Sequence, residues 1–275
     1  MNKTLFIITI IVSILSLLYI ILSYVGVLRY CALNMKSPKS YIEKYKSADK
    51  ASSSRVVISM SASEKDLFSL RPVINSLLDQ TVKVDEIAIN IPDSYTKIPK
   101  DLSNYTVVHK TAYNYEDAQD IIPTILREKE ADTIIIVLKP DTIYGENFIE
   151  KMVSYLHKDN VVNLSHKNNS GYMKHPYVVK VGYFTDGFLD KVTDNYNSDN
   201  SENFAKILFD FLSKKELKSI DYRENFKSVR NTRNTRVKEN VRERRERLLK
   251  QRPRRHKRLP TVVYDNQNDF TSFVV

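Results

Sequence analysis

Hydrogen-bonding and charged side chains directly follow several short apolar runs of this 275-residue sequence. Serines close the first run, an asparagine and an aspartate close the second, and a lysine and an aspartate follow the most hydrophobic one. These residues are Ser59, Ser61, Asn90, Asp93, Lys139 and Asp141. Groups of this kind can hold a polar or charged ligand through hydrogen bonds and ion pairs. Serine and aspartate are also ordinary turn formers and helix caps, so the residue types leave both interpretations open.

The apolar runs have the β-branched composition of strands that are covered on both faces of a sheet. We expect strands at 56–60, 86–91, 105–109 and 133–138. Apolar residues at helical spacing predict helices at 67–78, 117–128 and 148–157. Pro72 is tolerable only near the first turn of its helix, and Pro123 predicts a kink or a late start of the second helix. Strands that alternate with helices indicate an α/β fold with a mostly parallel sheet and helices on both faces. Ligands of such sheets bind at the carboxyl ends of the strands, where the polar side chains of this chain lie.

The chain after residue 160 is rich in Asn, Asp, Ser and Tyr, and fewer elements can be predicted there. We expect one strand at 177–184 and one amphipathic helix at 202–217. The folded unit is expected to end near Asn225. The predicted domain therefore covers 55–225, which is enough chain for one hydrophobic core.

The segment from Leu5 to Leu28 has 24 residues and no charge. A helix of this length, at ~1.5 Å per residue, exceeds the ~30 Å hydrocarbon core of a bilayer. We therefore predict a single-pass transmembrane anchor over 1–28, with a cleaved signal peptide and a buried core helix as the alternatives. The Lys- and Ser-rich segment 29–54 has no apolar periodicity and predicts a stalk.

Six basic residues follow the predicted anchor before residue 51, whereas Lys3 alone precedes it. The positive-inside rule therefore predicts that the body lies on the cytosolic side. Three glycosylation sequons, at Asn104, Asn163 and Asn168, would favour a lumenal body instead. Cys31 is the only cysteine, so no intrachain disulfide can form, in agreement with the cytosolic side.

The net charge of +10 is concentrated in one segment of the chain. Residues 227–258 contain 15 Lys and Arg and 3 Glu, and the remainder of the sequence is close to neutral. This composition predicts a basic tail over 226–275, partly helical and partly disordered. Such segments bind nucleic acid by releasing counterions and also bind anionic lipid, and both partners stay open here, with a solvated tail that binds neither as the alternative.

Several phrases between residues 55 and 150 occur together in one known family. They are RVVISM at 55–60, LRPVINSLLDQTVKVDEIAINIP at 70–92, DIIPTILREKEADTIII at 120–136, Ile143-Tyr144 and Phe148-Ile-Glu150. With these phrases the chain resembles the GT-A-fold, family-2-like glycosyltransferases of large DNA viruses and microbes. The resemblance implies a Rossmann-like sheet, a nucleotide-sugar donor as partner, and transfer of the sugar to a hydroxyl group with inversion.

Members of this family end the fourth strand in an acidic cluster that holds Mn²⁺ or Mg²⁺ against the donor diphosphate. When the chains are aligned on Ile143-Tyr144, this sequence has Lys139, Pro140 and Asp141 at the cluster, so only Asp141 remains as a metal ligand. One carboxylate makes a poor dedicated metal site, although Mg²⁺ often takes few protein ligands and borrows phosphate oxygens. Lys139 could itself place a cation beside the diphosphate, or it could simply point into solvent.

Inverting members of the family carry carboxylates before a later helix, and one of them deprotonates the acceptor hydroxyl. The resemblance implies Asp199 as this base, with Glu202 in reserve; a helix cap is the alternative for both. It also implies that Ser59, Ser61, Asn90 and Asp93 hold the nucleoside, and that Asp117 and Asp120 lie near the ribose or diphosphate.

Two hypotheses follow for the function. The first is a membrane-anchored glycosyltransferase, and the second is an inactive relative that kept the scaffold and acts as a membrane-anchored interaction protein. The histidines at 109, 157, 166 and 175 lack the spacing of a metal site, and we interpret them as structural or exposed.

Overall fold

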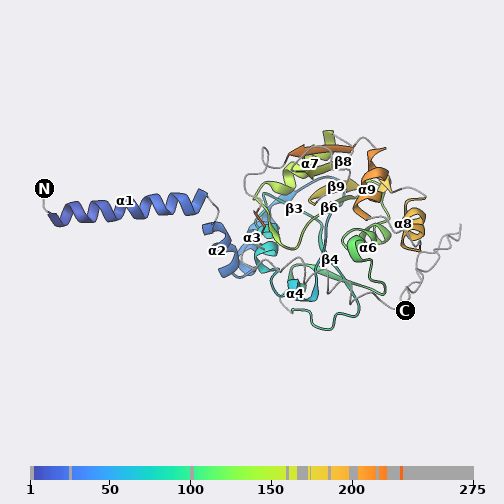
Figure 1. Cartoon of the computed structure of the whole chain (residues 1–275), viewed down its shortest axis with the longest axis horizontal. Helices are drawn as coiled ribbons and strands as arrows, with labels where there is room; N and C mark the ends of the chain where they lie inside the picture. The colour runs from blue at the N-terminus through green and yellow to red at the C-terminus, as the bar shows by residue number, and fades with distance from the viewer. Residues whose placement is uncertain are drawn as a thin grey trace, which may run out of the picture.

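The computed structural model describes residues 3–24, 27–99, 102–158, 161–165, 173, 175–184, 187–197, 204–214, 217–221 and 230–231. Figure 1 shows one long helix, α1 (Lys3–Tyr24), that projects from a body of helices around a sheet. The predicted basic tail lies outside the described residues, apart from the short strand β11 (Arg230–Asn231).

A seven-stranded sheet forms the centre of the body, in the order β10-β8-β9-β6-β2-β4-β5. Its strands are β2 (Val56–Ser61), β4 (Glu86–Pro92), β5 (Val107–Thr111), β6 (Ile134–Val137), β8 (Val161–Ser165), β9 (Tyr177–Lys180) and β10 (Leu217–Asp221). All pairs in the sheet are parallel except those of β9, which is antiparallel to β6 and to β8. The predicted α/β fold with a mostly parallel sheet is therefore confirmed.

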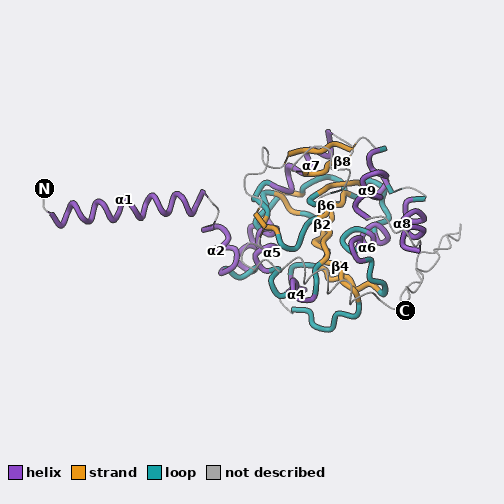
Figure 2. The backbone as a smooth tube through the Cα atoms, in the orientation of Figure 1, coloured by secondary structure: helices purple, strands orange, loops and turns teal. Residues whose placement is uncertain are grey.

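Helices cover both faces of the sheet, and alternate side chains of each central strand enter different cores. In β6, Ile134 and Ile136 belong to the core beneath α5 (Arg71–Leu78) and α7 (Phe148–Lys158). Ile135 and Val137 belong to the core beneath α6 (Ile122–Arg127), α8 (Phe188–Asn197) and α9 (Phe204–Ser213). Figure 2 shows α6, α8 and α9 on the side of the sheet away from α5. Burial on both faces explains why these strands are continuously apolar.

Two predicted helices begin later than their apolar spacing indicates, and proline explains both differences. The region 67–78 divides into α4 (Glu64–Leu67) and α5, with Pro72 in the first turn of α5. The region 117–128 divides into a 3₁₀ turn, η2 (Glu116–Ala118), and α6, with Pro123 in the first turn of α6. A proline has no N–H to donate and its ring clashes with the preceding turn, so each helix starts only one residue before its proline.

The remaining boundaries also differ from the predictions. The expected strand 105–109 is β5, shifted toward the C-terminus, and the expected strand 177–184 is β9 followed by η3 (Val181–Tyr183). The expected helix 202–217 is α9, whereas α8, β8 and β10 were not predicted. The short elements are β1 (Asp49–Lys50), β3 (Val82–Lys83), η1 (Leu102–Asn104) and β7 (Thr142–Ile143).

The expected stalk 29–54 is instead part of the folded body. It contains most of α2 (Val27–Met35) and all of α3 (Lys39–Ser47), and the side chain of Leu33 is 1% exposed in the core. The buried Asn75 amide of α5 donates hydrogen bonds to the carbonyls of Leu33 and Lys36, at 2.6 and 2.9 Å. Arg29 forms an ion pair with Asp79 at 3.1 Å. The stalk prediction was wrong because α2 and α3 bury only a few residues. Lysines and serines lie between these residues, so the sequence shows no apolar periodicity.

Helix α1 is long and apolar enough to cross a membrane. Its stretch Thr4–Leu22 has a mean hydropathy of 3.0, and none of it is buried. A signal sequence near the N-terminus can have the same length and composition. The transmembrane anchor over 1–28 therefore stays a proposal.

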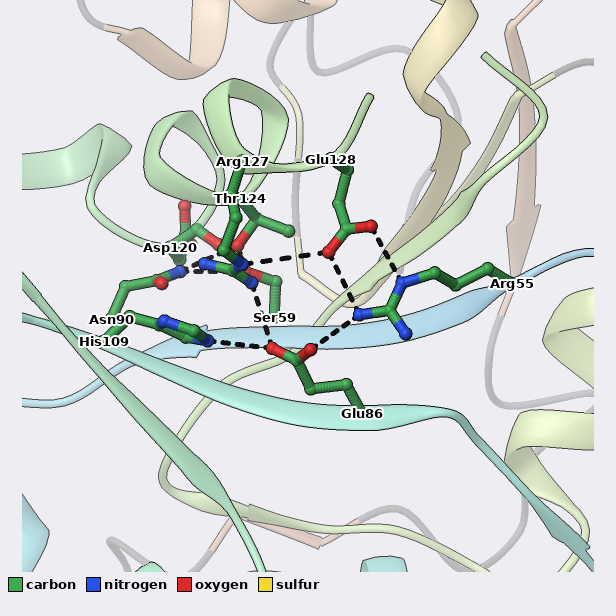
Figure 3. Close-up of polar contacts among 9 residues, drawn as sticks. All are labelled: Arg55, Ser59, Glu86, Asn90, His109, Asp120, Thr124, Arg127 and Glu128. Atoms are coloured by element: carbon green, nitrogen blue, oxygen red, sulfur yellow. Dashed lines mark hydrogen bonds and ion pairs between the residues drawn. The ribbon is translucent and has the colours of Figure 1, made fainter. Parts of the chain in front are cut away.

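An ion-pair cluster joins the amino ends of β2 and β4 to the end of α6 (Figure 3). The carboxylate of Glu86 contacts Arg55 at 2.6 Å, His109 at 2.8 Å and Arg127 at 3.2 Å. Arg55 also pairs with Glu128 at 2.8 Å. The hydrogen bond from His109 lowers the pKa of Glu86 to about 2, and the charge of Arg127 and the hydrogen bond from Arg55 add to this effect, although partial burial opposes them.

Glu86 makes the stability of the fold sensitive to acid. Its pKa in the folded chain lies below its ordinary value of 4.5, so its contribution is complete above pH 4.5 and is lost as the pH falls toward 2. We expect Glu86→Gln to lower the unfolding temperature of the full chain in detergent at pH 7, and the gap to wild type to shrink between pH 4.5 and 2. Glu130→Gln, at an exposed position, is the matched control and should leave the profile unchanged. A gap that stays constant over this pH range would show that the cluster does not stabilise the charged form of Glu86.

Candidate functional site

The order of the strands identifies the edge of the sheet at which a ligand would bind. From β2 the chain proceeds outward to β4 and β5, and it then returns to the other side of β2 to form β6. The strand order therefore reverses between β2 and β6, which is the topological switch point where ligands of open α/β sheets bind at the carboxyl ends of the strands. Ser61 ends β2, and Lys139 follows the end of β6. We call this side of the sheet the carboxyl edge.

Ser59 and Asn90 lie next to each other, but they face the protein interior. Asn90 Nδ2 donates hydrogen bonds to Ser59 Oγ at 3.0 Å and to Thr124 Oγ1 at 2.9 Å, and the two hydroxyls are 2.6 Å apart. All three side chains are fully buried (Figure 3). We call Ser59, Asn90 and Thr124 the Ser59 cluster. The sequence suggested that Ser59 and Asn90 bind a ligand, whereas in this structure their side chains join β2, β4 and α6.

Ser61 and Asp93 lie closer to the surface at the same edge. Ser61 is partly exposed and pairs in register with Asn90 across β2 and β4. Asp93 is exposed, and its backbone N–H donates to the carbonyl of Thr111 at 2.9 Å. Both side chains are therefore accessible to a ligand at the carboxyl edge.

The turn after β6 holds Lys139 and Asp141 at the switch point. The hydroxyl of the fully buried Tyr144 accepts a hydrogen bond from the Lys139 N–H at 2.9 Å and donates to the Lys139 carbonyl at 3.3 Å. Burial, followed by the nearby Asp141, raises the pKa of Tyr144 well above its ordinary value, so it stays a neutral donor. Tyr144 thus fixes the backbone of Lys139, whose side chain is exposed.

Asp141 does not form a dedicated metal site with other side chains of the described part of the chain. It is 9% exposed, and its Oδ1 accepts a hydrogen bond from Thr142 Oγ1 at 3.2 Å. Among the described residues, no group of three His, Cys, Asp or Glu side chains could hold a metal ion. Since Mg²⁺ requires six ligands in near-octahedral geometry, this donor set does not fit a metal held by the protein alone.

A second group of polar side chains lines a cavity of about 220 Å³ beside the switch point. The cavity is lined by Asp117, Asp120, Met173, His175, Tyr177, Phe204, Ala205 and Leu208. His175 Nε2 and Asp120 Oδ2 are joined by a hydrogen bond. The sequence suggested Asp117 and Asp120 as residues near a ligand, but it did not indicate His175, because the two partners are 55 residues apart in the chain. We call this space the Asp120 cavity.

Asp199 and Glu202, the carboxylates predicted as general bases, lie outside the described residues. They fall between the end of α8 and the start of α9. Their role stays a prediction from the sequence.

Comparison with known proteins gives only distant likenesses. No protein-family model matches the chain, and no curated protein matches it. The chain is similar to the solved structure of 4-diphosphocytidyl-2C-methyl-D-erythritol synthase from Anaerococcus prevotii DSM 20548, with 12% identity and a TM-score of 0.47 over 71% of this chain and 99% of that one. It is also similar to the glycosyltransferase GlyE of Streptococcus pneumoniae TIGR4, with 12% identity and a TM-score of 0.43 over 63% of this chain and 47% of that one. These values leave the activity to be argued from the site itself.

The Ser59 cluster should contribute measurably to stability. Thr124→Val preserves the shape of the side chain and removes the hydroxyl that accepts from Asn90, so a buried donor loses a partner. We expect the free energy of unfolding of the full chain to fall by ~1–3 kcal/mol, measured by urea denaturation in detergent. Thr96→Val makes the same chemical change at an exposed position and should stay within ~0.5 kcal/mol of wild type. Equal effects of the two substitutions would contradict a stabilising role for the cluster.

Proposed function

We propose that this chain is a membrane-anchored, glycosyltransferase-like protein that binds a nucleotide-sugar donor at the carboxyl edge and transfers the sugar to a hydroxyl group with inversion. The observation that carries the proposal is the reversal of strand order between β2 and β6, with Ser61 and Lys139 at its two sides. The resemblance of residues 55–150 to the GT-A-fold, family-2-like glycosyltransferases supports it independently.

The proposed donor lies with its nucleoside toward Ser61 and Asp93 and its diphosphate toward Lys139. The leaving nucleoside diphosphate develops negative charge as the bond to the sugar breaks, and a fixed cation beside it stabilises that charge. Lys139 supplies such a charge, and Tyr144 fixes the backbone that carries it. The donor set around Asp141 does not fit a metal held by the protein alone, so the proposed reaction depends on Lys139 for the positive charge.

The acceptor hydroxyl needs a base, and the sequence offers Asp199, with Glu202 in reserve, for this role. Helix α1 is proposed to anchor the chain in a membrane with the body on the cytosolic side, as the basic residues after the anchor favour. The basic segment 227–258 is proposed to bind anionic lipid or nucleic acid.

Titration calorimetry on the full chain in detergent tests donor binding. UDP-sugars and GDP-sugars are titrated with and without Mn²⁺. We expect binding without the metal, and we expect Lys139→Ala to weaken it ~10–100-fold, because a hydrogen bond to a charged group contributes ~1.5–3 kcal/mol.

Lys191→Ala is the matched control, since it removes an exposed lysine of α8 and should leave the affinity unchanged. Binding that Lys139→Ala does not alter would remove Lys139 from the site. The absence of heat in every condition would reject the donor and favour the inactive, interacting relative instead.

A further inference from the structure

The Asp120 cavity contains a carboxylate and an imidazole in the arrangement of an oriented base. The side chain of Asp120 is 9% exposed, and its Oδ2 is hydrogen-bonded to His175 Nε2. Its Oδ1 is buried and has no hydrogen-bond partner in the described part of the chain. The negative charge of Asp120 is therefore directed at one partner, the ring of His175.

The Ser59 cluster holds the backbone of Asp120 in place. Ser59 Oγ donates a hydrogen bond to the backbone carbonyl of Asp120, and Thr124 lies beside it on α6. The ring of Tyr177 packs against the imidazole of His175 with the ring centroids 5.2 Å apart. Both members of the pair are thus held by buried neighbours, as a base that must keep one orientation requires.

His175 lies at the same edge of the sheet as Lys139. The antiparallel ladder pairs Val137, the last residue of β6, with Tyr177, the first residue of β9. Lys139 follows this pair by two residues, and His175 precedes it by two. The side chain of His175 is 24% exposed, so the imidazole is partly accessible while its carboxylate partner is buried.

We propose that His175 is the proton acceptor for the hydroxyl that receives the sugar, with Asp120 as its positioning residue. This inference rests on the proposed function and assigns the base of the same reaction. With the proton of the neutral ring on Nε2, which donates to Asp120, the lone pair of Nδ1 faces away from the carboxylate and can accept a proton.

The proposed transfer step accounts for every bond that breaks or forms. The acceptor O–H bond breaks, and its proton moves to Nδ1 of His175. The oxygen forms a bond to the anomeric carbon of the donor sugar, and the bond from that carbon to the diphosphate oxygen breaks, so the leaving nucleoside diphosphate takes the electron pair. Asp120 stabilises the imidazolium that results, since its carboxylate lies against the protonated ring.

The other groups around the ring are compatible with this role. Among the described residues, the titratable side chains that line the cavity with His175 are Asp117 on η2, Asp120, and Tyr177 on β9; the lining side chains of α9 are apolar. Burial raises the pKa of Tyr177 well above its ordinary value, and the neighbouring Asp120 adds to this effect, so Tyr177 stays neutral. Within the described part of the chain, Asp120 is therefore the buried charged side chain of this lining that contacts the imidazole.

Hydrolysis of UDP-glucose and GDP-mannose by the full chain in detergent tests the inference, with water in place of the unidentified acceptor and nucleoside diphosphate release as the signal. We expect His175→Gln to lower kcat by ~10²–10⁴-fold, the usual contribution of a general base. Donor affinity by calorimetry should stay unchanged, because the base does not hold the donor. Asp120→Asn should lower kcat in the same direction, and added imidazole should partly restore turnover to His175→Ala.

His157→Gln, an exposed histidine on α7, is the matched control and should keep the wild-type kcat. Asp199→Asn and Glu202→Gln are measured beside it. The inference is overturned if folded His175→Gln and Asp120→Asn keep the wild-type kcat. It is also overturned if only Asp199→Asn or Glu202→Gln loses turnover. In both cases the contact between His175 and Asp120 is structural, and the proposed function still stands. Donor binding without turnover by the wild type would also overturn the inference, whereas failure to bind any donor would instead reject the proposed function.

Discussion

The hydrogen bonds of Ser59 beneath helix α6 connect the interior of the sheet to both parts of the candidate site. The Ser59 hydroxyl reaches the Asp120 carbonyl on one side, and its own backbone carbonyl accepts from the Leu138 N–H on the other, at 2.9 Å. Leu138 leads directly into the turn with Lys139. The buried residue Ser59 therefore links Asp120, which contacts His175, to the turn that carries Lys139. Buried hydrogen bonds of this kind hold their groups in place, because breaking one leaves an unpaired polar group in a low dielectric.

The sequence predicted the centre of this architecture well and its surroundings poorly. Strands β2, β4 and β6 are covered on both faces, so their runs of β-branched residues identify them without knowledge of their neighbours. The spacing of the apolar residues extends past the prolines of α5 and α6, but Pro123 also predicted a kink or a late start, and α6 does start late. Helices α2 and α3 gave no such signal. Each contributes only a few buried groups, such as Leu33 and Tyr41, and their contacts with α5 depend on residues distant in the chain.

The sequence predicted which edge of the sheet carries the candidate site, but it did not predict the orientation of every side chain there. Because carboxyl ends of parallel strands meet at one edge, Ser61 and Lys139 could be placed together from the sequence. The sequence could not show that Ser59 and Asn90 turn toward α6, since their exposure depends on how that helix packs. It also could not show the contact between Asp120 and His175, which exists only because β9 runs antiparallel beside β6 and returns residue 175 to the same edge.

The charged side chains at the carboxyl edge suit two different parts of the proposed transfer reaction, which are departure of the diphosphate and removal of the acceptor proton. An exposed lysine is screened by water, so Lys139 would act strongly on a diphosphate only when the ligand and a covering segment exclude solvent. The short strand β11 pairs with β7 and places Arg230 in register with Ile143, two residues after Asp141. Arg230, the basic residue of segment 227–258 that lies within the described part of the chain, is therefore on a strand beside the turn that carries Lys139. Asp120, in contrast, is a buried negative charge, and a negative charge suits the side on which a proton is removed. In the proposed function these two charges meet opposite needs, Lys139 beside the leaving group and Asp120, through His175, on the side of the acceptor.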